Sequence, residues 1–325
     1  MPDILTLAAE NLLSPIVLFF ALGLCASLAR SDLSVPEAAA KALSIYLLFA
    51  IGFKGGVSVA DHGVDAKLGL TLLAGVILSA ALPFLAFVLL RILTPMDRLN
   101  AAAVAGHYGS ISIVTFVAAT SVLETSGITA EGYMVAVAAA MEAPAILSAL
   151  WLVTAGNKEG RVDSGLWREI LLNGSIVLLV GSFLIGWVTG KDGLAEIESF
   201  IVAPFKGVLC LFLLDMGLVA GRGMRKGRGA LGFGAIVFGI LMPVLGAIAG
   251  LAASLLLGLT LGGTVLLMVL SASASYIAVP AAMRVALPEA NPSIYLTLSL
   301  GVTFPFNLTL GIPLYLAMAN AIIGG

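Results

Sequence analysis

The chain is built from two halves whose landmark residues recur about 161 positions apart. Single matches carry little weight in a chain rich in Gly, Ala and Ser, but together they keep a nearly constant offset. In a membrane chain, a duplicated half with an odd number of spans lies upside down relative to its copy, as in many secondary transporters. The matched residues are Gly56 with Gly217, Lys54 with Asp215, Pro144 with Pro305, Ser14 with Ser175, and 110–112 with 271–273, while Pro83 and Pro243 match to within one position.

The composition is that of a membrane protein. Hydrophobic residues make up 60% of the 325 positions and charged residues only 10%, whereas soluble domains carry about 25% charged residues. A net charge of -2 excludes the basic surplus of a nucleic-acid-binding protein. Cys25 and Cys210 both lie in apolar runs, which favours buried thiols over a disulfide or a metal site.

Ten apolar segments are long enough to cross a bilayer, whose core of about 30 Å needs roughly 20 helical residues. A polar linker at 156–168 divides them five plus five, giving a first repeat at 1–155 and a second at 169–325. We therefore expect an all-α polytopic membrane protein with ten transmembrane helices in an inverted repeat. The expected spans are 12–30, 36–60, 66–94, 98–123, 131–155, 169–190, 197–221, 229–257, 260–286 and 293–322.

Charge placement predicts the orientation. Loops after the odd-numbered spans, with their flanks, hold 12 of the 16 basic residues, and such loops face the cytoplasm. Both termini should then face outside, and the acidic N-terminus, which lacks a clear cleavage site, indicates a permanent first span. The cluster Arg222, Arg225, Lys226 and Arg228 fits a topogenic signal or a binding site for anionic lipid or a cytosolic regulator. The twelve are Arg30, Lys41, Arg91, Arg98, Lys158, Arg161, Arg168, Arg222, Arg225, Lys226, Arg228 and Arg284.

Two carboxylates fall inside predicted spans, where a charge costs about 3 kcal/mol on insertion scales. Glu142 lies in the middle of the fifth span, two residues before Pro144, which frees backbone carbonyls. A carboxylate beside free carbonyls suits sodium, and the alternative is a protonated or hydrogen-bonded structural residue. Asp215 and its repeat partner Lys54 are open to a mutual ion pair, to backbone contacts, to snorkelling at the interface, or to a role in transport.

The fourth and ninth spans carry the most polar chemistry. Residues 106–115 and 271–280 place serines with glycine or proline halfway through each span. A helix interrupted at membrane depth offers N–H groups to an anion and carbonyls to sodium. Small residues also occur where helices simply pack closely, but their presence at the same place in both halves favours function. No Ser/His/Asp or His/Cys constellation is present, so we do not expect an enzyme.

At these segments the sequence resembles the sodium-dependent bicarbonate transporter family, best known from cyanobacteria. Gly106, Gly109, Ser112 and Thr115 look like the family's first broken helix, and 141–145 is similar to its acidic residue before a proline. The loop 288–295 and the ending 312–314 also match.

The resemblance implies a mobile core of spans 3–5 and 8–10, a gate of spans 1, 2, 6 and 7, and an elevator mechanism. It also implies a homotrimer in the bacterial cytoplasmic (inner) membrane, with regulation by a PII-like cytosolic protein in some members. The chain departs from the family at Tyr276, where family members commonly have an acidic residue. It also departs at His107 and Tyr108, which replace a more apolar pair. The family's long cytoplasmic insertion between the halves is absent.

We therefore predict import of bicarbonate, or a similarly small anion, with sodium as the coupling ion and no other cofactor. Alternatives are a sodium symporter for an organic anion and a non-transporting membrane scaffold. Membrane lipids are expected partners and nucleic acid is not. The predicted anion-binding residues are Tyr108, Gly109, Ser110, Ile111, Ser112, Ser273, Ala274, Ser275 and Tyr276, and the predicted sodium-binding residues are Glu142, Thr115, Thr303 and Asn307.

Overall fold

The computed structural model describes 12–323 with short gaps, and every regular element in that part of the chain is helical. The predicted linker 156–168 and the basic residues Arg228 and Arg284 lie outside the described residues. The gaps fall at 64, 155–173, 227–231, 277–278, 281–282, 284–286 and 288.

Seven of the described helical stretches are long and apolar enough to cross a membrane. Three shorter apolar helices, α2, α6 and α13, fall where further spans are predicted. The chain is thus a multi-pass membrane protein. Its helices are α2 (Pro15–Leu28), α3 (Glu37–His62), α4 (Ala66–Leu93), α5 (Arg98–His107), α6 (Ile113–Thr125), α7 (Met134–Ala140), α8 (Glu142–Thr154), α10 (Gly174–Ile201), α11 (Phe205–Lys226), α12 (Phe233–Leu257), α13 (Leu261–Ala272), α15 (Pro292–Leu298), α16 (Phe304–Phe306) and α17 (Ile312–Ile323).

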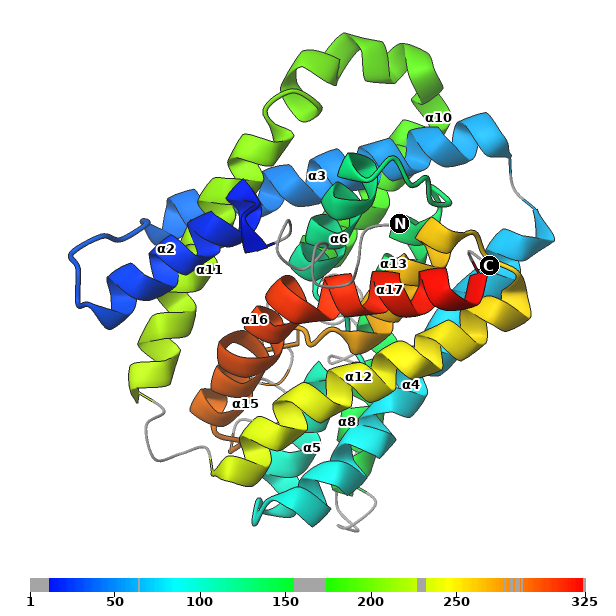
Figure 1. Ribbon diagram of the computed structural model, residues 1–325. Helices are drawn as coiled ribbons and strands as arrows, with labels where there is room; N and C mark the ends of the chain where they lie inside the picture. The colour runs from blue at the N-terminus through cyan, green and yellow to red at the C-terminus, as the bar shows by residue number, and fades with distance from the viewer. Residues whose placement is uncertain are drawn as a thin grey trace.

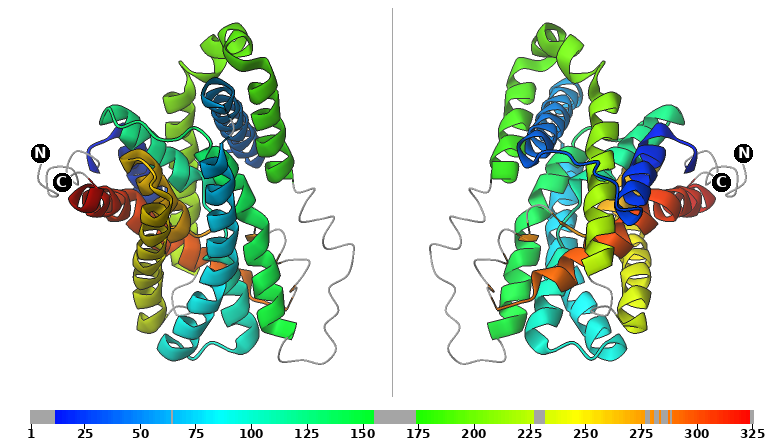
Figure 2. Two further views of the ribbon diagram at one scale, coloured as in Figure 1. Left: turned by 90° about the vertical axis from the view of Figure 1, so that its right-hand side faces the viewer. Right: turned by 90° about the vertical axis from the view of Figure 1, so that its left-hand side faces the viewer.

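The helices form two groups. α2, α3, α10 and α11 pack together on one side, and α4, α5, α8, α12 and the run from α15 to α17 on the other (Figure 1). Within the first group α3 packs along α10, and α11 packs along α2. The views in Figure 2 show the bend of α10 standing clear of the second group.

Two glycines equated by the repeat make the closest contacts in the first group. A Cβ on Gly56 would lie 1.9 Å from the Phe183 carbonyl oxygen of α10, and a Cβ on Gly217 would lie 2.1 Å from the Phe20 carbonyl oxygen of α2. Both helix pairs therefore meet backbone to backbone, which is the small-residue packing that membrane helices favour. The two glycines equated by the repeat thus have the same role: Gly56 allows α3 to approach α10 closely, and Gly217 allows α11 to approach α2 closely.

The boundary predicted between the sixth and seventh spans is wrong. α10 continues through a bend at Gly190 (φ 59°) as far as Ile201, and α11 begins at Phe205 rather than at 197. The physical reason is the charge of the segment after the bend. Lys191, Asp192 and Glu196 are exposed there, so this turn of helix lies at the surface and does not start the next span.

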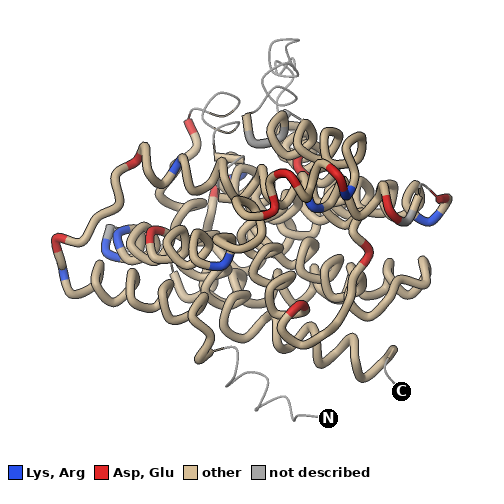
Figure 3. Tube along the Cα trace, turned by 90° about the horizontal axis from the view of Figure 1, so that it is seen from above, with Lys and Arg blue, Asp and Glu red and all other residues tan. Residues whose placement is uncertain are grey.

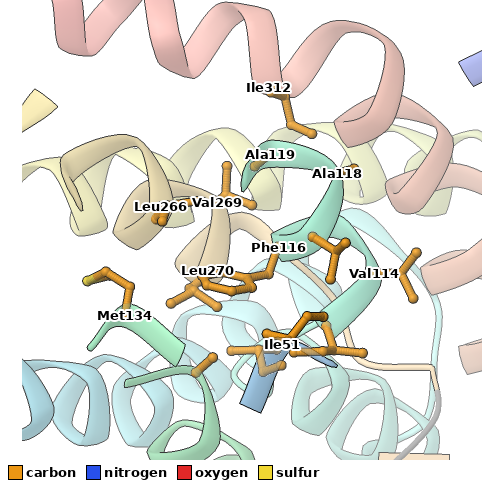
Figure 4. Packing of buried hydrophobic residues seen from close by; sticks show 14 of the residues in the cluster. Ile51, Val114, Phe116, Ala118, Ala119, Met134, Leu266, Val269, Leu270 and Ile312 are labelled. Atoms are coloured by element: carbon orange, nitrogen blue, oxygen red, sulfur yellow. The ribbon is translucent and has the colours of Figure 1, made fainter. Parts of the chain in front are cut away.

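The centre of the molecule is apolar where the two groups meet. Phe116 of α6 packs with Leu270 of α13, and Ile51 of α3 joins them from the first group (Figure 4). Most of the helical trace is free of charged residues, as Figure 3 shows. Large apolar side chains such as Leu70 and Ile77 are exposed on α4, where a bilayer would cover them.

Candidate functional site

The break expected in the fourth span is present. α5 ends at His107 and α6 begins at Ile113, so 108–112 cross the middle of the molecule without helical structure. Ser112 caps α6, because its hydroxyl accepts a hydrogen bond from the Thr115 backbone N–H at 3.3 Å. Gly109 makes the bend possible: a Cβ there would lie 2.4 Å from the Pro83 ring of α4.

The ninth span is also interrupted. α13 ends at Ala272, and 273–276 continue without helical structure. The Ser273 hydroxyl donates to the Leu270 carbonyl at 2.9 Å, which satisfies one of the carbonyls left free at the end of α13. Ser273 and Ser275 are both buried.

The two breaks touch each other. The Ser112 backbone N–H donates to the Ser273 hydroxyl at 2.9 Å, and the Ser275 backbone N–H donates to the His107 carbonyl at 2.8 Å. Hydroxyls and backbone N–H groups from both halves of the chain therefore gather at one buried place beside the N-terminus of α6. Such a place can hold a small anion by hydrogen bonds and by the positive end of the helix dipole.

Glu142 lies beside the first break. The helix of the fifth span is interrupted at Met141, since Pro144 lacks the N–H that would bond to the carbonyl of residue 140. The Glu142 side chain is buried, with 7% exposed, and its Oε2 accepts a hydrogen bond from the Ser110 hydroxyl at 3.0 Å. The Ser79 hydroxyl of α4 donates to the Met141 carbonyl at 2.6 Å and holds this bend in place.

Thr303 and Asn307 lie in two π-helical segments of the last span. These are Ser299–Thr303 and Asn307–Gly311, and Pro305 and Pro313 follow close to them. π-segments inside α-helices are frequent at functional sites because they turn side chains and free carbonyls toward the interior. The sequence predicted these residues but gave no sign of the π-segments.

Thr303 connects the first break to α12. Its hydroxyl donates to the Gly239 carbonyl at 2.6 Å and lies 2.7 Å from the Tyr108 hydroxyl. Because Thr303 has one hydroxyl hydrogen and gives it to Gly239, Tyr108 is the donor in the second contact. The Thr303 oxygen is left with one further lone pair.

The side chain of Asn307 contacts the C-terminal end of α13. Its side-chain N–H donates to the Ala272 carbonyl at 2.9 Å, and its oxygen accepts from the Tyr315 hydroxyl at 2.8 Å. Carbonyls at a helix C-terminus carry partial negative charge and favour a cation.

A family model described as the Na+-dependent bicarbonate transporter superfamily matches residues 15–320. The chain belongs to this superfamily. A search of curated proteins found no match. The matched region contains both breaks, Glu142 and the π-segments, and the resemblance noted from the sequence is confirmed.

The fold of this superfamily member brings most of the predicted site residues into contact with one another. Glu142 bonds to Ser110, Thr115 donates to the Ser112 hydroxyl at 2.9 Å, and Thr303 bonds to Tyr108. Asn307 bonds to Ala272, next to Ser273. Among the described residues the hydrogen-bonding partner of Glu142 is Ser110 and not one of the other predicted sodium ligands, so the hydrogen bonds do not join the four ligands into one shell.

The remaining predicted residues line the same region. Ile111 and Ala274 are buried apolar residues of the two breaks. The Tyr276 hydroxyl faces Ser112, without meeting hydrogen-bond geometry to any of the described residues. Its ring packs edge-to-face on Phe304, with centroids 5.2 Å apart.

Two cavities lie at positions that the repeat equates. One, of about 460 Å³, lies between α3, α6 and α7 and is lined by Gly55, Ser58 and Val135. The other, of about 600 Å³, lies between α11 and α15 and is lined by Met216, Val219 and Leu296, the residues that the 161-residue offset equates with those three. The second cavity reaches Tyr276, a residue of the candidate site.

The charged pair equated by the repeat does not pair with itself. Lys54 Nζ of α3 lies 3.6 Å from Glu124 Oε1 of α6. Asp215 is buried, with 3% exposed, and forms no ion pair with any of the described residues. The mutual ion pair considered from the sequence is therefore not formed.

Sequence reasoning missed four residues that shape the site: His107, Ser79, Gly239 and Tyr315. Each acts through a contact with a residue at least eight positions away, and Ser79 and Gly239 lie in otherwise ordinary apolar helices. His107 alone had a signal, since it replaces an apolar residue of the family pattern.

Proposed function

We propose that the chain is a secondary active transporter that imports bicarbonate together with sodium across the bacterial cytoplasmic membrane. The observation that carries this proposal is the pairing of predicted sodium ligands with predicted anion-binding residues. Glu142 with Ser110, Thr115 with Ser112, and Thr303 with Tyr108 are all hydrogen-bonded. A cation and an anion held by these residues would share one buried pocket.

Sharing one pocket gives a physical basis for coupling. A lone bicarbonate or a lone sodium ion in a low-dielectric interior loses far more hydration energy than neutral hydrogen bonds return. Together the two charges offset each other, so each ion raises the affinity for the other. Glu142, with Thr115, Thr303, Asn307 and nearby carbonyls, would hold sodium.

Neutral donors would hold the anion. The hydroxyls and backbone N–H groups of Tyr108, Gly109, Ser110, Ser112, Ser273, Ser275 and Tyr276 would supply them, with Ile111 and Ala274 as apolar lining. Ser112 and Ser275 would contribute through their hydroxyls, because their backbone N–H groups already donate to Ser273 and His107. No positively charged side chain is among these residues, so an anion bound between the two breaks can leave once sodium has left. Transport requires this release.

The proposed mechanism is elevator-like alternating access within a ten-span, five-plus-five inverted repeat, with both termini outside. The two cavities at equated positions support it, because inverted copies would place them on opposite sides of the membrane. The group containing α4, α5, α8 and α12 would be the moving core, and α2, α3, α10 and α11 the gate. A homotrimer and a PII-like cytosolic regulator are supported by the family resemblance alone.

Uptake into liposomes tests the proposal. Purified protein should accumulate labelled bicarbonate under an inward sodium gradient, and an equal potassium gradient or protein-free liposomes should give background uptake. Uptake at the same rate without sodium would overturn the coupling. Short carboxylates that compete more strongly than bicarbonate would favour the organic-anion symporter, and absence of transport for every anion would favour a scaffold.

A further inference from the structure

His107 lies outside the predicted anion and sodium sets, yet it is joined to the second break at two points. Its carbonyl accepts from the Ser275 backbone N–H at 2.8 Å, and its ring Nδ1 lies 2.5 Å from the Ser275 carbonyl oxygen. We propose that His107 is a positioning residue that fixes the backbone at Ser275 and thereby the second half of the anion site. This inference rests on the proposed function for its effect on transport, but not for its geometry.

The second break needs such an anchor. Residues 273–276 have no helical structure, so their backbone groups must find partners elsewhere. Ser273 is held through its hydroxyl by Ser112 and Leu270. At Ser275, both the backbone N–H and the carbonyl are held by His107.

His107 is itself rigidly placed. It ends α5, is fully buried with 0% exposed, and its ring stacks on Tyr295 of α15 with centroids 4.6 Å apart and planes 26° apart. One ring thus connects the first break, the second break and the start of the last span. A shift of α5 or α15 would be transmitted directly to Ser275.

The contact assigns the proton on the ring. The Ser275 carbonyl can only accept, so Nδ1 carries the hydrogen, and in the neutral ring Nε2 is then a bare acceptor. The Nε2 atom is buried without a partner among the described residues. Burying an unpaired acceptor is unfavourable, and an apolar side chain would fill the same space without that cost. The Nδ1 donor is therefore what distinguishes histidine at this position.

The anchor has no equivalent in the other half. The 161-residue offset equates His107 with Met268 and Ser275 with Val114, and a methionine thioether has no hydrogen to donate. The site is thus asymmetric at this point although the surrounding scaffold repeats.

Three substitutions test the anchor in sodium-driven uptake. His107→Leu removes the donor and keeps an apolar side chain, and His107→Asn keeps an N–H near the position of Nδ1. His107→Gln moves the N–H toward the position of Nε2. We expect the KM for bicarbonate to rise about 3- to 10-fold in His107→Leu and His107→Gln, the change that loss of one hydrogen bond gives. In His107→Asn it should stay within about 2-fold of wild type.

A wild-type KM in His107→Leu would overturn the proposal, and so would a His107→Asn variant as impaired as His107→Leu. Thermal unfolding of each variant in detergent identifies any that fail to fold. Both the Leu and the Asn variant lose the packing of the imidazole ring, but only the Asn variant keeps an N–H donor. The difference in KM between the folded variants therefore reports the donor.

A measurement without transport separates this inference from the proposed function. The chain has two histidines, so in a ¹⁵N-histidine-labelled His62→Gln variant the only labelled ring is that of His107. We expect the spectrum of a neutral ring protonated at Nδ1. A ring protonated at Nε2 would overturn the anchor. If no anion is taken up with sodium, the proposed function fails, and the tautomer still decides the role of His107.

Discussion

The backbone N–H of Ser112 donates a hydrogen bond to the hydroxyl of Ser273 at 2.9 Å, and the two residues stand 161 positions apart. That separation is the offset of the sequence repeat, so two equivalent residues touch. In a pair of copies related by a two-fold axis, a residue that meets its own equivalent lies close to the axis. Under the proposed inverted repeat, the axis passes through the candidate anion site.

Ser273→Ala tests this contact. The substitution leaves the buried Ser112 N–H without its acceptor, which costs about 1–3 kcal/mol. We expect the free energy of unfolding to fall by that amount and the KM for the anion to rise. Ser126→Ala is the matched control, because the Ser126 hydroxyl is exposed at the end of α6. Equal effects of the two substitutions would contradict the assignment of Ser273 to the site.

Glu142→Gln tests the sodium site. The amide keeps the shape of the side chain and its contact with Ser110 but removes the charge that attracts sodium. We expect the sodium concentration for half-maximal uptake to rise at least about 10-fold, corresponding to 1.4 kcal/mol. The exposed Glu198 offers the control Glu198→Gln, which should match wild type. Unchanged sodium dependence in Glu142→Gln would assign this residue a structural role.

Gly56→Ala and Gly217→Ala test the packing of the gate helices. Each new methyl group would lie about 2 Å from a backbone oxygen of the neighbouring helix, and overpacking of this kind costs about 1–3 kcal/mol. Thermal unfolding in detergent should show both variants destabilised by similar amounts. Gly181→Ala in α10 and Gly207→Ala in α11, where the described part of the chain places no neighbouring helix within 4 Å of the new Cβ, should be neutral or slightly stabilising. A destabilised control, or a neutral Gly56→Ala, would contradict the packing.

The helix breaks were predictable because their causes are local. Glycine at 109 and the serines at 110, 112 and 273 favour interruption of a helix through their own backbone and side-chain chemistry. Pro144 likewise marks the interruption beside Glu142. The position of the site along the chain could therefore be read from the sequence.

The connections within the site could not be predicted in this way. The bond between Tyr108 and Thr303 joins residues 195 positions apart, and no local pattern reports such a pair. His107 reads as one buried residue until its ring is seen against Ser275. The bend at Gly190 also escaped prediction, since a charged helix after a span looks like a loop in sequence.

Asp97 provides a pH test at a helix start outside the spans. The Asn100 backbone N–H and side-chain amide donate to its carboxylate and hold the pKa of Asp97 below its usual range. Its stabilisation is therefore present above the unfolded pKa of about 3.9 and is lost as pH falls through the folded value. Asp97→Ala should cost about 1 kcal/mol at pH 7.

The cost of Asp97→Ala should shrink as the pH is lowered toward 3. Asp97→Asn keeps a capping oxygen without a titrating charge, so its stability difference from Asp97→Ala should not depend on pH. Thermal unfolding at several pH values checks both. A cost of Asp97→Ala that stays constant down to pH 3 would show that the carboxylate charge plays no part.

The most direct test of the whole account is a panel of labelled anions presented to liposomes under an inward sodium gradient. At alkaline pH, where bicarbonate predominates over carbon dioxide, we expect bicarbonate to be taken up faster than formate, acetate and nitrate, and only when sodium is present. Faster uptake of an organic anion, or bicarbonate uptake that is indifferent to sodium, would contradict the proposed function.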